Sequence, residues 1–252
     1  MESEEYKVMY EAEDVHWWYR GLRGVMATTL QLPPRAGKQL RILDAGCGTG
    51  GNLSALEKMG QTEAEGFDLS PIALDFCRRR GLTNTKQGSI TAIPYPDNRF
   101  DVAISCDVLT DAGTDNEMTA LLELRRVLKP GGRLFLNLPA YGFLRGEHDQ
   151  ATDVARRYTR RELKERLNEA GFTVRRISYW NMFLFPVVLL VRLIRRGDPE
   201  GAAGSARSDI VVPAAPINVL LTAFMAVERV LLRRFALPFG SSVAVVATKP
   251  RR

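Results

Sequence analysis

Four residues at alternate positions, an aspartate and three glycines, form the segment of this chain best suited to bind a ligand. Asp44, Gly46, Gly48 and Gly50 follow an apolar pair, residues 42–43, in the order D-x-G-x-G-x-G. Glycines at the end of a strand let backbone approach a ligand where a Cβ atom would clash. The spacing indicates a loop for a nucleotide-like ligand, and NAD, FAD and S-adenosylmethionine (SAM) all remain candidates.

A second acidic residue ends the next apolar segment. Asp68 follows residues 64–67 and lies about twenty residues after the glycines, where a carboxylate can accept hydrogen bonds from both ribose hydroxyls. The alternate glycines do not fit the NAD fingerprint G-x-G-x-x-G. The chain also lacks the Gly-Lys-Ser/Thr of a nucleoside-triphosphate P-loop. Both of those ligand classes are therefore disfavoured.

At this point the chain resembles the class I SAM-dependent methyltransferases. Three later segments are similar to motifs of that family in the same order, namely residues 87–90, 93–105 and 124–136, the last of which contains a Lys-Pro-Gly-Gly turn. The resemblance implies an α/β, Rossmann-like fold. It has a mostly parallel seven-stranded sheet of order 3-2-1-4-5-7-6, helices on both faces and SAM as cofactor, with S-adenosylhomocysteine (SAH) as product.

The resemblance also assigns cofactor roles. Asp44 and the loop 46–50 would hold the methionyl end, Asp68 the ribose, and Ser89 with the Ile90 amide the adenine, although the family usually has Asp in place of Ser89. The complete predicted set is Asp44, Gly46, Cys47, Gly48, Gly50, Asp68, Leu69, Gly88, Ser89, Ile90, Cys106, Asp107, Trp17 and Arg20.

Two segments are expected to complete the site. Residues 13–23 resemble a stretch that caps the cofactor pocket in similar bacterial enzymes, and His16, Trp17 and Arg20 are the cap candidates. Residues 139–149 follow the fifth strand, where the family binds acceptors. His148 and His16 are rival general bases because imidazole titrates near neutrality. A structural role remains the alternative for each of them. The predicted acceptor contacts are Tyr141, His148, Arg157 and Tyr158.

Alternating patterns predict one domain over residues 1–252. Strands are expected at 41–45, 64–68, 85–87, 101–106, 133–138, 173–179 and 243–248, with helices at 52–59, 71–80, 116–128 and 160–170. An N-terminal helical cap would occupy residues 1–38. The core sheet would occupy 40–180 and 241–250, and a helical insertion would occupy 181–240.

The insertion is predicted to contain two apolar helices, at residues 181–196 and 216–235. On the second helix one face carries Ile217, Leu220, Leu221, Phe224, Val227, Leu231 and Phe235, and another carries Asn218, Thr222, Arg229 and Arg233. A lid or a homodimer interface is the favoured interpretation, and peripheral contact with a membrane surface is the alternative. Pro213, Pro216 and Asn218 argue against a transmembrane span.

Composition narrows the choice of partner and compartment. The net charge is +6, but the arginines are scattered and no aromatic ladder accompanies them, so nucleic acid is not expected. Residues 105–108 read Ser-Cys-Asp-Val and differ from the Asn/Asp-Pro-Pro-Tyr motif that base methyltransferases carry there. Three cysteines without CxxC spacing fit a reducing cytoplasm and predict no metal site. The acidic residues 2–5 do not resemble a signal peptide.

These observations together predict transfer of a methyl group from SAM to an O, N or C nucleophile of a small molecule. Residues 157–163 and 238–242 resemble bacterial methyltransferases associated with saccharide, lipid-linked or secondary-metabolite intermediates. The alternative is a catalytically silent SAM-fold subunit that binds a partner or a membrane surface through the inserted helices.

Overall fold

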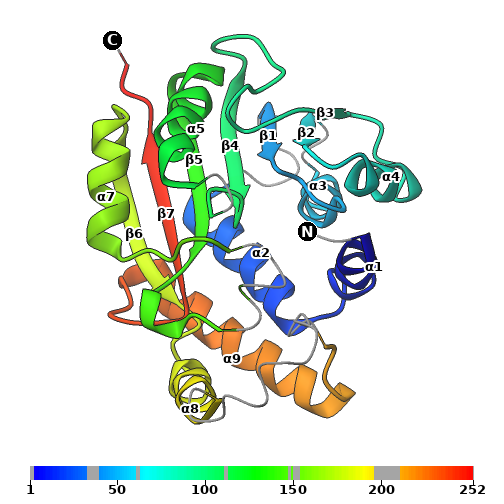
Figure 1. Cartoon of the computed structure of the whole chain (residues 1–252), viewed down its shortest axis with the longest axis vertical. Helices are drawn as coiled ribbons and strands as arrows, with labels where there is room; N and C mark the ends of the chain where they lie inside the picture. The colour runs from blue at the N-terminus through cyan, green and yellow to red at the C-terminus, as the bar shows by residue number, and fades with distance from the viewer. Residues whose placement is uncertain are drawn as a thin grey trace.

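The computed structural model describes residues 3–32, 40–60, 63–110, 113–146, 149, 154–195 and 211–251 (Figure 1). The predicted base His148 lies outside these residues. So does the Gly/Ala/Ser-rich stretch at 197–208.

Seven strands of the described chain form one sheet in the order β3-β2-β1-β4-β5-β7-β6, which confirms the predicted order. The strands are β1 (Ile42–Ala45), β2 (Ala64–Asp68), β3 (Thr85–Gln87), β4 (Phe100–Cys106), β5 (Leu128–Pro139), β6 (Thr173–Trp180) and β7 (Ser242–Thr248). All neighbouring pairs are parallel except those of β7, which runs antiparallel to both β5 and β6. The carboxyl ends of six strands therefore share one edge with the start of β7.

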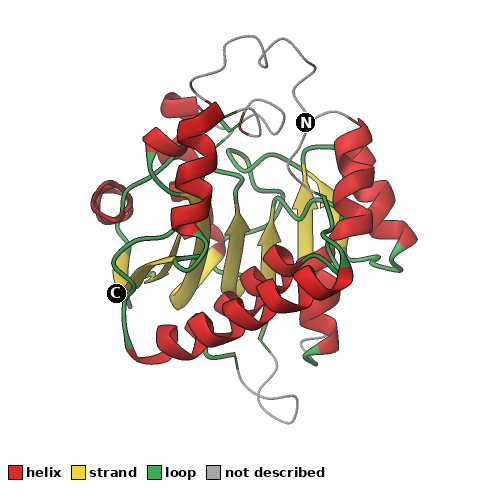
Figure 2. Cartoon of the chain, turned by 90° about the horizontal axis from the view of Figure 1, so that it is seen from below, coloured by secondary structure: helices red, strands yellow, loops and turns green. Residues whose placement is uncertain are grey.

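Helices cover both faces of this sheet (Figure 2). They are α1 (Ser3–Ala12), α2 (Trp17–Leu30), α3 (Gly51–Lys58), α4 (Pro71–Arg79), α5 (Gly113–Val127), α7 (Arg160–Glu169), α8 (Phe185–Arg195) and α9 (Ala215–Arg234), with a short 3-10 helix η1 (Gly142–Leu144). One core contains side chains of α5 and α7, and the other contains side chains of α2, α3, α4 and α9. Strand β4 contributes Ala103 to the first and Val102 and Ile104 to the second, as alternation along a strand requires.

Local chemistry explains where several helices begin. Ser70 caps α4, its hydroxyl accepting from the Ala73 amide at 3.4 Å, and Pro71 takes the first helical position. Thr159 and Glu162 form a reciprocal capping box at α7. The first inserted helix begins at Phe185 and not at residue 181, because Asn181 has a φ of 60° and residues 181–184 form a loop.

The second inserted helix packs in an unusual orientation. Its buried residues are Asn218, Met225, Glu228 and Leu232. Asn218 accepts from the Trp17 amide and donates to the Val15 carbonyl, both at 2.9 Å, so it joins α9 to the start of α2. Glu228 accepts from the Met182 amide at 3.0 Å. Most of the apolar face identified in the sequence, including Ile217, Leu220, Phe224 and Val227, is exposed instead.

Candidate functional site

The glycine-rich loop follows β1 at the carboxyl edge of the sheet. Gly46, Gly48 and Gly50 all have φ between 53° and 87°. A Cβ atom on Gly46 would lie 2.3 Å from Val108 Cγ2, so this position requires glycine for space as well as for conformation. The Gly46 and Cys47 amides both donate to the Phe67 carbonyl at 2.9 Å, which ties the loop to the end of β2.

Asp44 is fully buried directly before this loop, and neither of its carboxylate oxygens has a hydrogen-bond partner among the described residues. Burial raises its pKa well above the ordinary value, and the nearby Glu13 and Asp68 carboxylates raise it further. A buried carboxylate without a partner is costly. A ligand that brings a cationic or hydrogen-bond-donating group to Asp44 would therefore stabilise the site.

Asp68 ends β2 and uses backbone amides to organise the same loop. Its Oδ2 accepts from the Gly48 amide at 2.8 Å and its Oδ1 accepts from the Ser70 amide at 2.9 Å. Burial raises its pKa, and these amides oppose that shift. The Leu69 amide also donates to this carboxylate. A carboxylate has about four acceptor positions, so one remains for a ligand.

Glu13 and Arg80 contact the glycine-rich loop at Thr49, and we call these three residues the clasp. Glu13 accepts from the Thr49 hydroxyl at 2.5 Å and from Arg80 Nη2 at 3.0 Å. Arg80 also donates to the Thr49 carbonyl at 2.9 Å and pairs with Asp14 at 2.7 Å. The Glu13 and Arg80 side chains are each 8% exposed, so this ion pair is buried. Sequence reasoning included Glu13 only as part of a capping stretch and assigned no role to Arg80.

His16 is the N-cap of α2 in the structure. Its Nδ1 accepts from the Trp18 amide at 3.2 Å, and a hydrogen bond with the Val211 backbone also engages the ring. Burial lowers its pKa. Trp17 is partly buried, whereas Arg20 is exposed on α2. The geometry thus gives His16 a structural task at the start of the cap.

The predicted adenine segment forms a tight turn after β3. The Gly88 amide donates to the Asp68 carbonyl at 3.0 Å, which brings this turn beside the ribose-binding candidate. The Ser89 hydroxyl lies 2.8 Å from that of Thr91, so it has a partner within its own turn. The Ile90 side chain is buried, and Leu69 presents an exposed apolar side chain next to Asp68.

A hydrogen-bonded chain of side chains crosses the ends of β4, β5 and β6. Trp180 Nε1 donates to Asn137 Oδ1 at 2.7 Å, and Asn137 Nδ2 donates to Asp107 Oδ2 at 3.0 Å. Asp107 has a φ of 60° and follows Cys106, whose thiol pKa is raised by burial and then by Asp44. Asn137 and Trp180 are fully buried, and neither was predicted from the sequence.

Aromatic rings gather after β5, in the segment predicted to bind the acceptor. Tyr141 stacks on Tyr179 and Phe143, with ring centroids 4.7 and 5.0 Å apart, and meets Phe185 of α8 at 5.8 Å. Burial raises the Tyr141 pKa, so its hydroxyl remains protonated at neutral pH. We call Tyr141, Phe143, Tyr179 and Phe185 the aromatic cluster.

Arg157 and Tyr158, which were also predicted to contact the acceptor, are held in interactions within the protein. Arg157 forms a buried bidentate pair with Asp149, with distances of 2.8 and 3.2 Å, and donates to the Ala140 carbonyl at 3.0 Å. Tyr158 is buried in the core, where its side chain has almost no surface left for an acceptor. The structure thus favours Tyr141 over Arg157 and Tyr158 as an acceptor contact. The Arg157–Asp149 pair fixes the residue next to His148.

These features fit SAM chemically. SAM carries a sulfonium and an ammonium cation, and Asp44 lies among the carboxylates of Glu13 and Asp68. The glycines leave backbone accessible, and Asp68 retains acceptor capacity for hydroxyls. No group of His, Cys, Asp or Glu in the described chain could hold a metal ion.

A seven-stranded sheet of this order, with a glycine-rich loop after β1 and an acid after β2, defines the Rossmann-like class of the doubly wound α/β folds. Residues 43–136 match the family model described as "Methyltransferase domain". This match places the glycine-rich loop, Asp68 and β4 within a methyltransferase domain, in agreement with the resemblance seen in the sequence.

Two known proteins are similar to this chain in amino-acid sequence. A Streptomyces fradiae protein described as "Uncharacterized 37.1 kDa protein in transposon TN4556" is 30% identical over 174 residues, covering 62% of this chain and 48% of that protein. A malonyl-[acyl-carrier protein] O-methyltransferase of Erwinia pyrifoliae is 37% identical over 112 residues, covering 44% of this chain and 42% of that protein. The chain thus spans less than half the length of these relatives.

A solved SAM-dependent methyltransferase from Mesorhizobium loti has a TM-score of 0.57 and 17% identity, covering 88% of this chain and 96% of that one. This likeness concerns the fold alone.

Proposed function

We propose that this protein transfers the methyl group of SAM to an oxygen nucleophile of a small-molecule acceptor. The observation that carries the proposal is Asp44, a fully buried carboxylate without a partner beside a glycine-rich loop. A cationic ligand would relieve that burial cost. The similarity to a malonyl-[acyl-carrier protein] O-methyltransferase supports an oxygen nucleophile. Neither a metal nor a nucleic acid is part of the proposal.

Three carboxylates would hold the cofactor. Asp44 would bind the ammonium group of the methionyl end, and Asp68 would accept hydrogen bonds from ribose hydroxyls. Asp107 would contact the cofactor beside Cys106. The Gly88 to Ile90 turn would hold adenine mainly through the Ile90 amide and the Leu69 side chain, since the Ser89 hydroxyl already has a partner in Thr91. The remaining predicted contacts are Gly46, Cys47, Gly48, Gly50, Trp17 and Arg20.

The chain's contribution to the reaction would be alignment and exclusion of water. Bound SAM supplies a methyl group that its sulfonium already activates for in-line displacement. The aromatic cluster would position an acceptor against that methyl group, and the clasp would keep water from the cofactor side. Residues 1–252 would act as a single domain, with residues 1–38 as a cap.

A protonated hydroxyl acceptor would also need a base, and His148 is the better of the two histidines. His16 engages backbone groups at the start of α2 and its pKa is lowered by burial. His148 follows the fifth strand, next to Asp149, which Arg157 holds in place. We therefore assign proton removal to His148 and a positioning role to His16.

A pair of single variants tests this assignment. His148→Ala should lower turnover by roughly 10²–10⁴-fold, the usual contribution of a positioned base, and should abolish the acidic limb of the rate profile. SAH affinity should stay unchanged. His16→Ala should cost about 1 kcal/mol of stability, as for other N-caps, and leave the pH profile intact. Collapse of turnover in His16→Ala alone would reverse the two roles.

The whole proposal is tested by calorimetry with SAH followed by methylation of a cell extract with labelled SAM and mass spectrometry. Binding together with a labelled small molecule supports it. Binding without transfer to any extract would instead favour the silent SAM-fold subunit.

A further inference from the structure

The outer face of α9 is apolar although it faces solvent. Val219, Leu220, Val227 and Val230 are 66%, 55%, 53% and 58% exposed, while the polar Asn218 and Glu228 are buried on the opposite face. A surface helix normally buries its apolar stripe and exposes its polar one. Large exposed apolar patches mark sites of contact with another molecule or a membrane. The outer side of α9 is therefore suited to contact with another apolar surface.

Helix α8 extends this surface. Val187 and Leu190 are each 58% exposed, and the ring of Phe183, just before α8, lies 6.1 Å from that of Phe224 on α9. Figure 1 shows both helices at the same end of the molecule. We define the α8–α9 face as Val187, Leu190, Val219, Leu220, Val227 and Val230.

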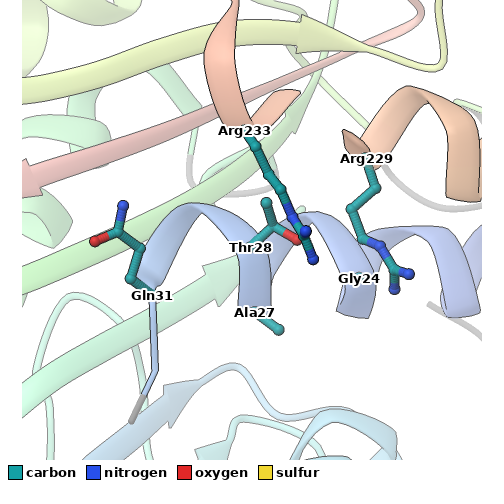
Figure 3. A pocket seen from close by; sticks show the side chains of 6 residues that line it. All are labelled: Gly24, Ala27, Thr28, Gln31, Arg229 and Arg233. Carbon is teal, nitrogen blue, oxygen red and sulfur yellow. The ribbon is translucent and has the colours of Figure 1, made fainter. Parts of the chain in front are cut away.

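A basic pocket involves Arg229, the residue next to Val230 of this face, and Figure 3 shows the side chains that line it. It has a volume of about 530 Å³ and lies between α2 and α9, lined by Gly24, Ala27, Thr28, Gln31, Arg229 and Arg233. None of these described lining residues is acidic. Figure 3 shows the Arg229 and Arg233 side chains reaching from α9 across α2 on the same side.

Gly24 makes room for the first of these arginines. A Cβ atom there would lie 3.1 Å from Arg229 Cδ, so the two helices approach closely at this point. The Arg229 Nε atom is buried without a hydrogen-bond partner in the described chain. A guanidinium group with an unused donor is suited to the oxygens of a phosphate group.

We propose that the α8–α9 face docks on the surface of an anionic phospholipid bilayer, with the Arg229–Arg233 pocket receiving a headgroup phosphate. Apolar side chains flanked by arginine are the pattern of helices that lie in the membrane interface. Charge complementarity favours an anionic bilayer over a second copy of the chain, because a two-fold interface would bring the same basic rim onto itself.

The helix α9 would lie on the bilayer and not cross it. By length and composition α9 could span a membrane. Its most apolar 18-residue segment has a mean hydropathy of 1.6, and 17% of that segment is buried within the protein. However, its inner face carries Glu228, which holds the Met182 amide, and Asn218, which holds the start of α2. Leaving these partners would expose a carboxylate and an amide to hydrocarbon.

The inserted helices are connected to the same edge of the sheet as the candidate cofactor site. The insertion leaves the sheet after Trp180 and returns at Ser242, both at the carboxyl edge that carries Asp44, Asp68 and Asp107. A bilayer on the α8–α9 face would therefore lie next to the same edge of the sheet. The docking itself does not depend on the proposed methyl transfer.

Flotation of the full chain with vesicles tests the proposal. Vesicles of equal parts phosphatidylglycerol and phosphatidylcholine should bind the protein, and pure phosphatidylcholine vesicles should bind it at least tenfold more weakly. Replacing both arginines, Arg229→Gln with Arg233→Gln, should lower the partition coefficient roughly 30-fold, because each basic side chain at an anionic surface contributes roughly fivefold. Val227→Ser with Val230→Ser should weaken binding to a similar extent.

A charge-matched control separates docking from general attraction. Arg161→Gln with Arg166→Gln removes the same charge from α7, which lies against the other core. That variant should bind vesicles within twofold of the parent. Unchanged thermal unfolding of every variant shows that the fold is intact.

Three results would overturn the proposal. The first is the absence of binding to the anionic vesicles, and the second is an equal loss of binding in the α7 control. The third is a stable dimer by light scattering that the Val227 and Val230 replacements dissociate while the parent does not bind vesicles, since that assigns the face to a second copy.

Discussion

The cofactor side and the acceptor side of the same sheet edge are built from different interactions. On the cofactor side, Asp68 holds the Gly48 and Ser70 amides at 2.8 and 2.9 Å, and charged and backbone groups determine the geometry. On the acceptor side, Tyr141 is held by ring stacking against Tyr179 and Phe143. Directional bonds specify one ligand closely, whereas stacked rings accept a range of shapes.

The two sides also come from different parts of the chain. The cofactor side uses glycine conformations and carboxylates that suit a single cofactor. The acceptor side uses residues of η1, β6 and α8, and α8 belongs to an insertion after β6. We therefore expect variants of the first side to change SAH affinity and variants of the second side to leave it unchanged.

The largest effect is expected from the clasp. Arg80→Met leaves the buried Glu13 carboxylate without its cation, which typically costs about 3–5 kcal/mol of unfolding free energy. Chemical denaturation measures this loss. Adding Glu13→Gln to the same variant should recover part of it, because the uncompensated charge is then gone. A single variant that unfolds like the parent would show that the clasp carries no stability.

Asp44 should affect binding and stability in opposite directions. Asp44→Asn should weaken SAH binding about 100-fold, equivalent to about 2.7 kcal/mol, by removing the charge proposed to hold the ammonium group. The ligand-free variant should be more stable at neutral pH than the parent, because no buried carboxylate remains without a partner.

The pH dependence follows from the raised pKa of Asp44. Protonated Asp44 contributes stability that is fully present below its unfolded pKa of about 3.9 and is lost as pH rises through the folded value. Denaturation of the ligand-free protein across pH should show this decline, and Asp44→Asn should lack it. An identical slope in both proteins would assign the decline to another group.

A smaller effect is expected at Asp68. Asp68→Ala should weaken SAH binding at least tenfold, since hydrogen bonds to a charged acceptor contribute about 1.5–3 kcal/mol each. Asp68→Asn keeps one acceptor oxygen and should fall between the parent and the alanine variant. Calorimetry that finds the same affinity for all three would remove Asp68 from the cofactor site.

The smallest effect should come from the acceptor side. Phe143→Ala removes an exposed ring stacked on Tyr141, and aromatic pairs contribute about 0.5–1.5 kcal/mol. Methylation of an extract should therefore slow about three- to tenfold while SAH affinity changes less than twofold. A parallel loss of SAH affinity would mean that the two sides are not independent.

Sequence patterns predicted the parts of the site that depend on short stretches of chain. The strand order is confirmed, and the predicted bounds of β2 and β3 match the structure to the residue. Asp44 and Asp68 stand at the ends of adjacent strands as expected. The strand bounds and the strand-end residues depend on alternation, glycine conformation and strand-end chemistry, all of which are local. The strand order is not local, and it was predicted from the resemblance to the methyltransferases.

Three features could not be predicted in this way. Arg80 pairs with Glu13 across 67 residues, and Asn218 holds the start of α2 across 201 residues. The apolar face of α9 is visible in the sequence, but its periodicity does not state which side meets the protein.

The amino-acid sequence by itself therefore determined the strand positions and the residues of the glycine-rich loop, because hydrophobic alternation and glycine conformation depend on neighbours along the chain. Only the tertiary structure decided that Asp44 has no partner, that His16 caps a helix, and that α9 buries Glu228 while exposing Val227 and Val230. These outcomes depend on which distant groups meet in the folded chain, and a buried polar group finds its partner, or lacks one, only after the chain has packed.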